Sequence, residues 1–245
     1  MRKTVLLAAL LLAAVSCSIN TGYYQDNLAM PLAQDSQDSL LFSVSMEYVR
    51  GGLSEAARDK VNATILSQAF DMEGDDTGSI EETAVRYREN LIDEYLTENG
   101  APEEPSGVLT WEDNVSGAFT KPYKNWLNYL LTYYSFRGGA HGIQTMSQVV
   151  FDRKSGEMLT QEDFFAPGYE EPLAALLREA VLASMQKDAP ELAELVEMDL
   201  VVPNGNFSVG KEGFQWIYQP YEVGPYALGI VMATLSWEQV EPYLK

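Results

Sequence analysis

His141 is the only histidine in the chain, and it stands in the glycine-rich segment 137–142, Arg-Gly-Gly-Ala-His-Gly. An imidazole titrates near neutral pH, so His141 could act as a general base or as a metal ligand. The sequence has no Gly-x-Ser-x-Gly nucleophile elbow beside it and no second histidine for a metal pair. The alternative is structural: the imidazole hydrogen-bonds to the backbone of a sharp turn whose glycines adopt positive φ. A lone histidine carries little catalytic information, so the structural role is favoured.

The acidic side chains offer two further possibilities. Asp71, Glu73, Asp75 and Glu82 occupy positions one, three, five and twelve of a calcium-binding loop, but Asp76 replaces the turn glycine of that pattern. Glu82 is also explained as a helix-capping residue, which favours a solvated loop. The other carboxylates are scattered, and their spacing selects no acid pair for glycoside hydrolysis.

Cys17 is the only cysteine, and it ends a segment with the features of a bacterial lipoprotein signal. Two basic residues open the chain, and the apolar run 5–15 suits a secretory signal peptide but is too short to span a membrane. We expect residues 1–16 to be cleaved and the sulfur of Cys17 to be lipidated. Ordinary cleavage after the small pair Ala14 and Ser16 is the alternative, and it leaves a free thiol. A single cysteine excludes a disulfide within the chain.

The net charge is −20, from 36 acidic and 16 basic residues, and removal of the signal peptide with its two basic residues makes it −22. Such a balance disfavours nucleic acid and anionic lipid as partners and favours cationic ones. The sequence holds neither a G-x-G-x-x-G motif after a strand nor a G-x-x-x-x-G-K-[ST] motif. We therefore expect no nucleotide cofactor, and the single histidine and cysteine predict no metal site.

Hydropathy patterns predict a segregated α+β fold with two small mixed sheets, each packed with its own helices. Residues 17–38 show no periodic apolar pattern, so we expect the lipidated cysteine to be followed by a flexible tether. An N-terminal domain is predicted over 39–140 and a C-terminal domain over 141–245. The expected strands are 42–49, 108–119, 126–136, 143–152, a strand near 207, 214–219 and 226–235, and the expected helices are 54–70, 79–99, 173–187, a stretch reaching about 200 and a short closing helix from 237.

Aromatic residues are the better indication of a binding surface. Phe214, Trp216 and Tyr218 alternate along one predicted strand and so share a face. Most aromatic side chains of this kind are expected in the core. A minority facing outward could stack on sugar rings or anchor a protein partner.

Two sets of motifs resemble a known family. The first is Gly138-Gly139-Ala140-His141-Gly142 with Ser155-Gly156-Glu157 and Glu162-Asp163-Phe164-Phe165, and the second is Gln219-Pro220-Tyr221-Glu222-Val223-Gly224-Pro225-Tyr226. Together they resemble the paired extracytoplasmic domains of unknown function found in RsiV-type anti-sigma factors and PdaC-type peptidoglycan deacetylases, and also as stand-alone bacterial lipoproteins. The resemblance implies a PdaC-like N-terminal domain and an RsiV-like C-terminal domain. In RsiV-like proteins this region recognises lysozyme, whereas in PdaC-like proteins it accompanies a separate catalytic domain.

The sequence thus predicts a non-enzymatic cell-envelope lipoprotein, on the periplasmic face, that binds a lysozyme-like cationic protein or a cell-wall component such as peptidoglycan. Tyr221, Glu222 and Tyr226 are the predicted contact residues, followed by His141. One alternative is a peptidoglycan or glycan hydrolase that uses His141 and a carboxylate such as Asp152. Another is a purely structural or assembly lipoprotein.

Overall fold

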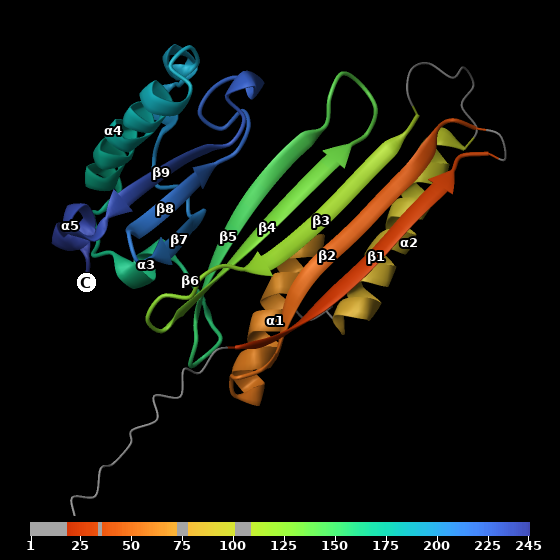
Figure 1. Ribbon diagram of the computed structural model, residues 1–245, viewed down its shortest axis with the longest axis horizontal. Coiled ribbons are helices and arrows are strands. Elements are labelled where there is room, and N and C mark those ends of the chain that lie inside the picture. The colour runs from red at the N-terminus through yellow and green to blue at the C-terminus, as the bar shows by residue number, and fades with distance from the viewer. Residues whose placement is uncertain (1–18, 34–35, 73–77, 101–108) are drawn as a thin grey trace, which may run out of the picture.

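Two β-sheets organise the residues that the computed structural model describes, 19–33, 36–72, 78–100 and 109–245 (Figure 1). The larger sheet has the strand order β1-β2-β3-β4-β5-β6. Its strands are β1 (Asn20–Pro31), β2 (Ser39–Gly51), β3 (Trp111–Phe119), β4 (Trp126–Phe136), β5 (Ile143–Asp152) and β6 (Met158–Leu159). All neighbours are antiparallel except β2 and β3, which are parallel and joined by a helical crossover.

That crossover consists of α1 (Glu55–Phe70) and α2 (Ile80–Asn99), which lie together on one face of the larger sheet (Figure 1). Both helices begin at a serine cap, as predicted. The Ser54 hydroxyl accepts from the amide of Ala57, and Ser79 forms a capping box with Glu82. The alternating buried residues of β2, such as Phe42 and Val44, pack with the inward stripe of the helices in one core. Of the calcium-loop residues, Glu73 and Asp75 lie outside the described residues.

The smaller sheet is β7 (Phe207–Gly210), β8 (Gly213–Tyr218) and β9 (Val231–Ser236), all antiparallel. The helix α4 (Glu170–Asp188) covers it, with the short helices α3 (Gln161–Phe164) and α5 (Trp237–Val240) at one end. Phe214, Trp216 and Tyr218 are fully buried, so this aromatic stripe is core. Two corrections are local: the stretch reaching 200 forms single 3₁₀ turns, Ala193–Leu195 and Met198–Leu200, and the last strand starts at Val231, after the 3₁₀ turn Tyr226–Leu228.

The predicted α+β class with two sheets is confirmed, but the predicted tether over residues 17–38 is wrong in its central part. Residues 20–31 form β1, which pairs with β2 over its whole length. Asp26 of this strand forms an ion pair with Arg88 of α2, while Leu28 packs against the core. The strand is polar because it lies at the edge of the sheet and only alternate side chains turn inward, so its sequence resembles a linker.

The predicted domain boundary between residues 140 and 141 is also wrong. The glycine-rich segment is the hairpin turn between two neighbouring strands, β4 and β5, and the first sheet continues to Leu159. Glycine-rich segments occur both in hairpin turns and in interdomain linkers, so the sequence pattern alone did not distinguish the two.

Side-chain amides join the two sheets. β6 covers the outer edge of β5 only at Val150 and Phe151. Further along this edge, the amides of Met146 and Gln148 donate to the side-chain oxygens of Gln219 (3.0 Å) and Asn206 (2.8 Å). The side chains of Asn206 and Gln219 in turn donate to the carbonyl of Met146. The buried amide of Asn128 on β4 makes two bonds to the backbone of Val209 on β7, at 2.9 and 3.0 Å.

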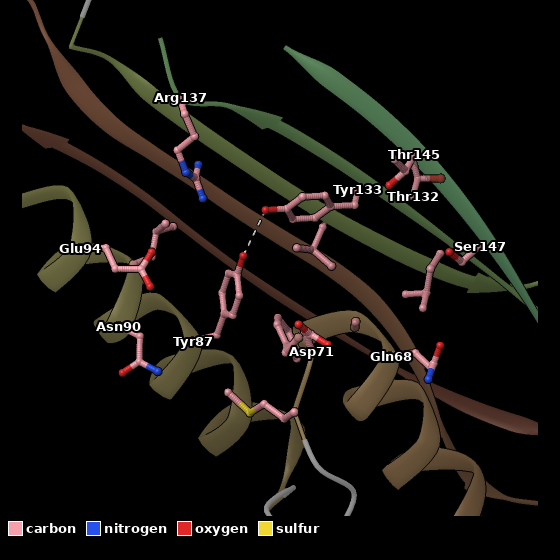
Figure 2. A pocket seen from close by; sticks show the side chains of 16 residues that line it. Gln68, Asp71, Tyr87, Asn90, Glu94, Thr132, Tyr133, Arg137, Thr145 and Ser147 are labelled. Carbon is pink, nitrogen blue, oxygen red and sulfur yellow. Dashed lines mark hydrogen bonds between the residues drawn. The ribbon is translucent and has the colours of Figure 1, made fainter. Parts of the chain in front are cut away.

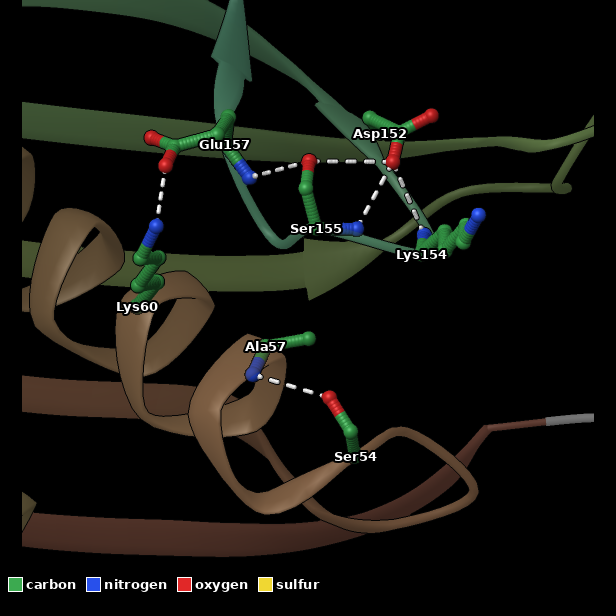
Figure 3. Close-up of polar contacts among 7 residues, drawn as sticks. All are labelled: Ser54, Ala57, Lys60, Asp152, Lys154, Ser155 and Glu157. Atoms are coloured by element: carbon green, nitrogen blue, oxygen red, sulfur yellow. Dashed lines mark hydrogen bonds and ion pairs between the residues drawn. The ribbon is translucent and has the colours of Figure 1, made fainter.

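The β5–β6 hairpin packs against the start of α1 (Figure 3). Asp152 accepts hydrogen bonds from the amides of Lys154 and Ser155, and Glu157 forms an ion pair with Lys60. At Gly156, φ is +75° and an added Cβ would lie 2.3 Å from the carbonyl oxygen of Ala57. Only glycine fits this close approach of hairpin and helix.

Gly156→Ala should therefore lower the free energy of unfolding by about 2–4 kcal/mol, because strain at positive φ adds to a backbone clash. The matched control is Gly139→Ala, since Gly139 has φ +89° but nothing within 4 Å of an added Cβ. In the Gly139→Ala control, the free energy of unfolding should fall by only about 1 kcal/mol. Urea unfolding measures both, and equal losses would contradict the close packing of the hairpin on α1.

Candidate functional site

Three of the four predicted contact residues meet at one end of the molecule. His141, exposed in the β4–β5 turn, stacks on Tyr226 of the loop after β8, with ring centroids 3.9 Å apart and an interplanar angle of 18°. The hydroxyl of Tyr226 donates to the carbonyl of Gly142 at 2.9 Å. The ring of Tyr221 lies 5.5 Å from that of Tyr226. We call His141, Tyr226 and Tyr221 the aromatic cluster, and it spans the two sheets.

Tyr221 is the more exposed of the two tyrosines in the cluster. Its φ is +71°, in the left-handed region, and its side chain is 57% exposed. Glu222, the fourth predicted residue, turns inward instead. Its carboxylate accepts from the amide of Gln219 and from the side chain of Asn204, both at 2.6 Å. Glu222 therefore shapes the loop that presents Tyr221, and its side chain is only partly exposed.

An acidic segment lies beside the aromatic cluster. Residues 191–202, here called the acidic rim, approach the loop closely: the amide of Glu197 donates to the carbonyl of Val223 at 2.9 Å. The rim carries four exposed carboxylates, and no basic residue occurs between positions 188 and 210. It also exposes apolar side chains. The carboxylates are those of Glu191, Glu194, Glu197 and Asp199, and the exposed apolar residues are Leu195, Leu200 and Val202.

His141 and Asp152 do not form a catalytic pair. His141 lies just before β5 and Asp152 is the last residue of that strand, so about 35 Å separates them at the usual rise of a strand. Burial alone would raise the pKa of Asp152, but hydrogen bonds from Ser155 and Lys154 outweigh it and hold the pKa below its usual value. Asp152 is thus an ionised turn residue. The imidazole Nδ1 of His141 lies 3.0 Å from the carbonyl of Gly142, which fits the structural role.

A cleft opens on the helix-bearing face of the larger sheet (Figure 2). The carboxylate of Asp113 on β3 is fully buried there and forms two hydrogen bonds with the guanidinium of Arg137, at 2.6 and 2.7 Å. Arg137 also lies over the ring of Trp111, 4.6 Å from its centroid. Tyr87 of α2 donates to Asp113 at 3.0 Å, and its hydroxyl lies 3.3 Å from that of Tyr133. This network fixes the position of α2 against the sheet.

The cleft has a volume of about 600 Å³ and a largely polar lining. Burial, and then the charge of Asp113, raises the pKa of Tyr87, so its hydroxyl stays protonated. Hydroxyl groups of β5 form one wall, and amide and carboxylate groups of the helices form the other. These side chains are Thr145 and Ser147 on β5, and Gln68, Asn90 and Glu94 on the helices. Sequence reasoning missed this cleft, although Asp113 was a signal, since it takes an inward position between Trp111 and Val115 of the expected strand.

Two features are absent from the described residues. No group of three or more histidine, cysteine, aspartate or glutamate side chains in them could hold a metal ion. Within the same residues, no helix is long and apolar enough to cross a membrane.

Residues 162–238 match the family described as "Protein of unknown function (DUF3298)". A crystal structure of a DUF3298 family member from Bacteroides fragilis superposes with a TM-score of 0.82 at 22% identity, over 93% of this chain and 94% of that one. For a DUF3298 family protein from Pseudomonas aeruginosa, the TM-score is 0.67 at 15% identity, over 93% and 95%. The chain has the fold of these DUF3298 proteins. No curated protein matches it in sequence.

The DUF3298 match includes Tyr221, Glu222, Tyr226 and the acidic rim, whereas His141 and the residues that line the cleft lie outside it. The match supports an uncharacterised domain of extracytoplasmic type. It does not single out the RsiV-like proteins, so that narrower resemblance stays a prediction.

Arg137→Leu should destabilise the protein by about 3–5 kcal/mol, because it leaves the buried carboxylate of Asp113 without its cation. The double variant Asp113→Leu/Arg137→Leu should recover most of this loss. Arg88→Leu serves as the control, since the Arg88–Asp26 pair is partly exposed and should contribute at most about 1 kcal/mol. Urea unfolding of the three variants measures these changes in the free energy of unfolding. Similar losses of stability for Arg137→Leu and Arg88→Leu would contradict the special role of the buried Asp113–Arg137 pair.

Proposed function

We propose that this chain is a lipid-anchored binding module of the cell envelope that recognises a cationic protein of the lysozyme type. The observation that carries the proposal is the position of Tyr221, which is exposed on the aromatic cluster directly beside the acidic rim. An exposed tyrosine offers a large contact area, and a surrounding field of carboxylates attracts a basic protein. The RsiV-like resemblance supports the same class of partner.

The lipoprotein-like segment 1–17 supports the location, with the periplasmic face favoured by the sequence. The net charge of −20 supports a cationic partner, since opposite charges accelerate encounter. The proposal contains no catalytic step, and it is supported by the wide separation of His141 from Asp152, the example of a carboxylate partner considered for a hydrolase.

Calorimetric titration of the mature chain with hen egg-white lysozyme should show binding that weakens with added salt, because rim charges are screened. Tyr221→Ala should weaken binding about tenfold or more, as expected for an aromatic anchor. Tyr23→Ala is the matched control: Tyr23 is also 57% exposed, but it lies on β1, away from the aromatic cluster.

Unchanged affinity in Tyr221→Ala, or equal losses in both variants, would exclude the aromatic cluster as the contact surface. Absence of heat at both salt concentrations would remove the lysozyme-type partner altogether.

The cleft favours a second ligand, a saccharide of the cell wall. Its walls combine hydroxyl and amide groups with the rings of Tyr87 and Tyr133, which is the combination that hydroxyl-rich ligands use. The groups with which it would bind a sugar, Thr145 and Ser147, belong to β5 and not to the core.

Thr145→Val/Ser147→Ala should weaken the binding of N-acetylglucosamine oligomers about fivefold or more, because two hydroxyl hydrogen bonds are lost. Gln144→Ala is the control, since Gln144 lies next to Thr145 on the strand, between Ile143 and Thr145, and so faces away from the cleft. Saturation-transfer NMR measures the binding of these oligomers to each variant. Equal signals from the two variants would exclude the cleft as the sugar site.

A further inference from the structure

Strand β1 starts only three residues after Cys17, the proposed lipid attachment site. An extended chain spans at most about 3.6 Å per residue, so the start of β1 would be held within about 10 Å of the membrane. This step rests on the lipid anchor of the proposed function. The anchor therefore fixes which end of the molecule is nearest to the lipid.

The start of β1 identifies that end, because Asn20 pairs with Gly51 at the end of β2. We call it the anchor end. Parallel pairing of β2 with β3 brings the β3–β4 loop there, and the β5–β6 hairpin packs beside it on the start of α1. The β7–β8 turn and the C-terminus also lie at this end (Figure 1). The turn is hydrogen-bonded to α5, and the C-terminal residue is hydrogen-bonded to α3. The aromatic cluster and the acidic rim lie at the opposite end, beyond the far end of β5.

The basic side chains without an ion-pair partner concentrate at the anchor end. In the described ranges, six basic residues form ion pairs with carboxylates: Arg58, Lys60, Arg88, Arg137, Arg178 and Lys187. Seven others take part in no ion pair in those ranges, and all of them lie at the anchor end. They are Arg50, Lys121, Lys124, Arg153, Lys154, Lys211 and Lys245.

Backbone contacts show that Lys211 and Lys245 lie at the anchor end. Lys211 follows Gly210, whose carbonyl accepts from the indole of Trp237 at 3.1 Å. The amide of Lys245 donates to the carbonyl of Phe164 in α3 at 3.0 Å. Both contacts belong to the helices that adjoin the start of β4, at the anchor end.

Aromatic rings accompany these cations. Trp126 and Trp237 stack with centroids 6.1 Å apart, and the ammonium of Lys124 lies 4.8 Å from the centroid of Trp237. Tyr123 completes the group, with Lys124 at 5.2 Å. Tryptophan, tyrosine and lysine together are typical of the membrane–water interface.

Several carboxylates of this end are already engaged. Glu157 pairs with Lys60, and Asp59 pairs with Arg58. Asp152 accepts hydrogen bonds within its own turn. Further carboxylates of this end are those of Glu55, Glu162, Asp163, Glu212, Glu238 and Glu241. The anchor end is therefore less acidic than the rim, whose residues 191–202 include no basic residue and are contacted by one cation, Arg178, through the carbonyl of Met198.

We propose that the anchor end lies on an anionic phospholipid surface through Lys121, Lys124 and Lys154. The interaction would orient the protein and would add little to the affinity of the lipid anchor itself. It directs the aromatic cluster and the acidic rim away from the membrane, towards a cationic partner. In the opposite orientation the acidic rim would face the anionic lipid, which would repel it.

The single cysteine allows a direct test. The chain from Cys17 to Lys245 is coupled through that thiol to maleimide lipids in vesicles of phosphatidylcholine, with or without phosphatidylglycerol. Acetylation of each lysine is then followed by mass spectrometry. On the anionic vesicles, Lys121, Lys124 and Lys154 should react about fivefold more slowly than on the neutral ones. Lys187, which is 83% exposed at the far end of α4, is the internal control and should react equally on both.

Equal reactivity of the three lysines on both kinds of vesicle would overturn the proposal, as would equal protection of Lys187. The charge-reversing variant Lys121→Glu/Lys154→Glu should abolish the protection of Lys124, whereas Lys187→Glu should preserve it. Chemical coupling makes the result independent of lipidation in the cell. Lysozyme binding is measured without vesicles, so failure of the proposed function and failure of this orientation are distinguishable.

Discussion

The two sheets are held together by side-chain amides that take the place of a missing strand at the edge of β5. Asn206 and Gln219 satisfy the backbone of Met146 and Gln148, and Asn128 binds both backbone groups of Val209. Unsatisfied groups of this kind cost about 1–3 kcal/mol each when buried. The amides therefore cap an edge that would otherwise attract another chain, and they fix the second sheet relative to the first.

This junction also creates the proposed binding surface. Gln219, which caps β5, is the residue at which the loop towards Tyr221 and Tyr226 begins, and Glu222 locks the loop by accepting from its amide. The loop then reaches across to His141 of the other sheet. The contact surface is thus a property of the assembled pair of sheets. Because this surface lies opposite the anchor end, a protein anchored to the membrane would present it away from the lipid, where a partner can reach it.

The sequence revealed elements with strong periodicity and clear caps, such as the helices that begin after Ser54 and Ser79. It failed where long-range pairing decides the structure. β1 has a linker-like composition and is a strand only because β2 offers its edge. Asp113 and Arg137 meet because their strands pair in register, with Glu112 opposite Phe136, which no local pattern encodes. The resemblance located the Tyr221–Tyr226 loop, but it gave no sign that the carboxylate of Glu222 accepts a hydrogen bond from Asn204.

Hydrogen exchange of the chain with and without lysozyme tests the central claim, that one surface assembled from both sheets binds a cationic protein. We expect slower exchange in two segments at once, the turn 138–142 and the loop 219–229, together with the acidic rim. Exchange in the β5–β6 hairpin at the anchor end should stay unchanged. Protection confined to one sheet, or to the anchor end, would contradict the claim.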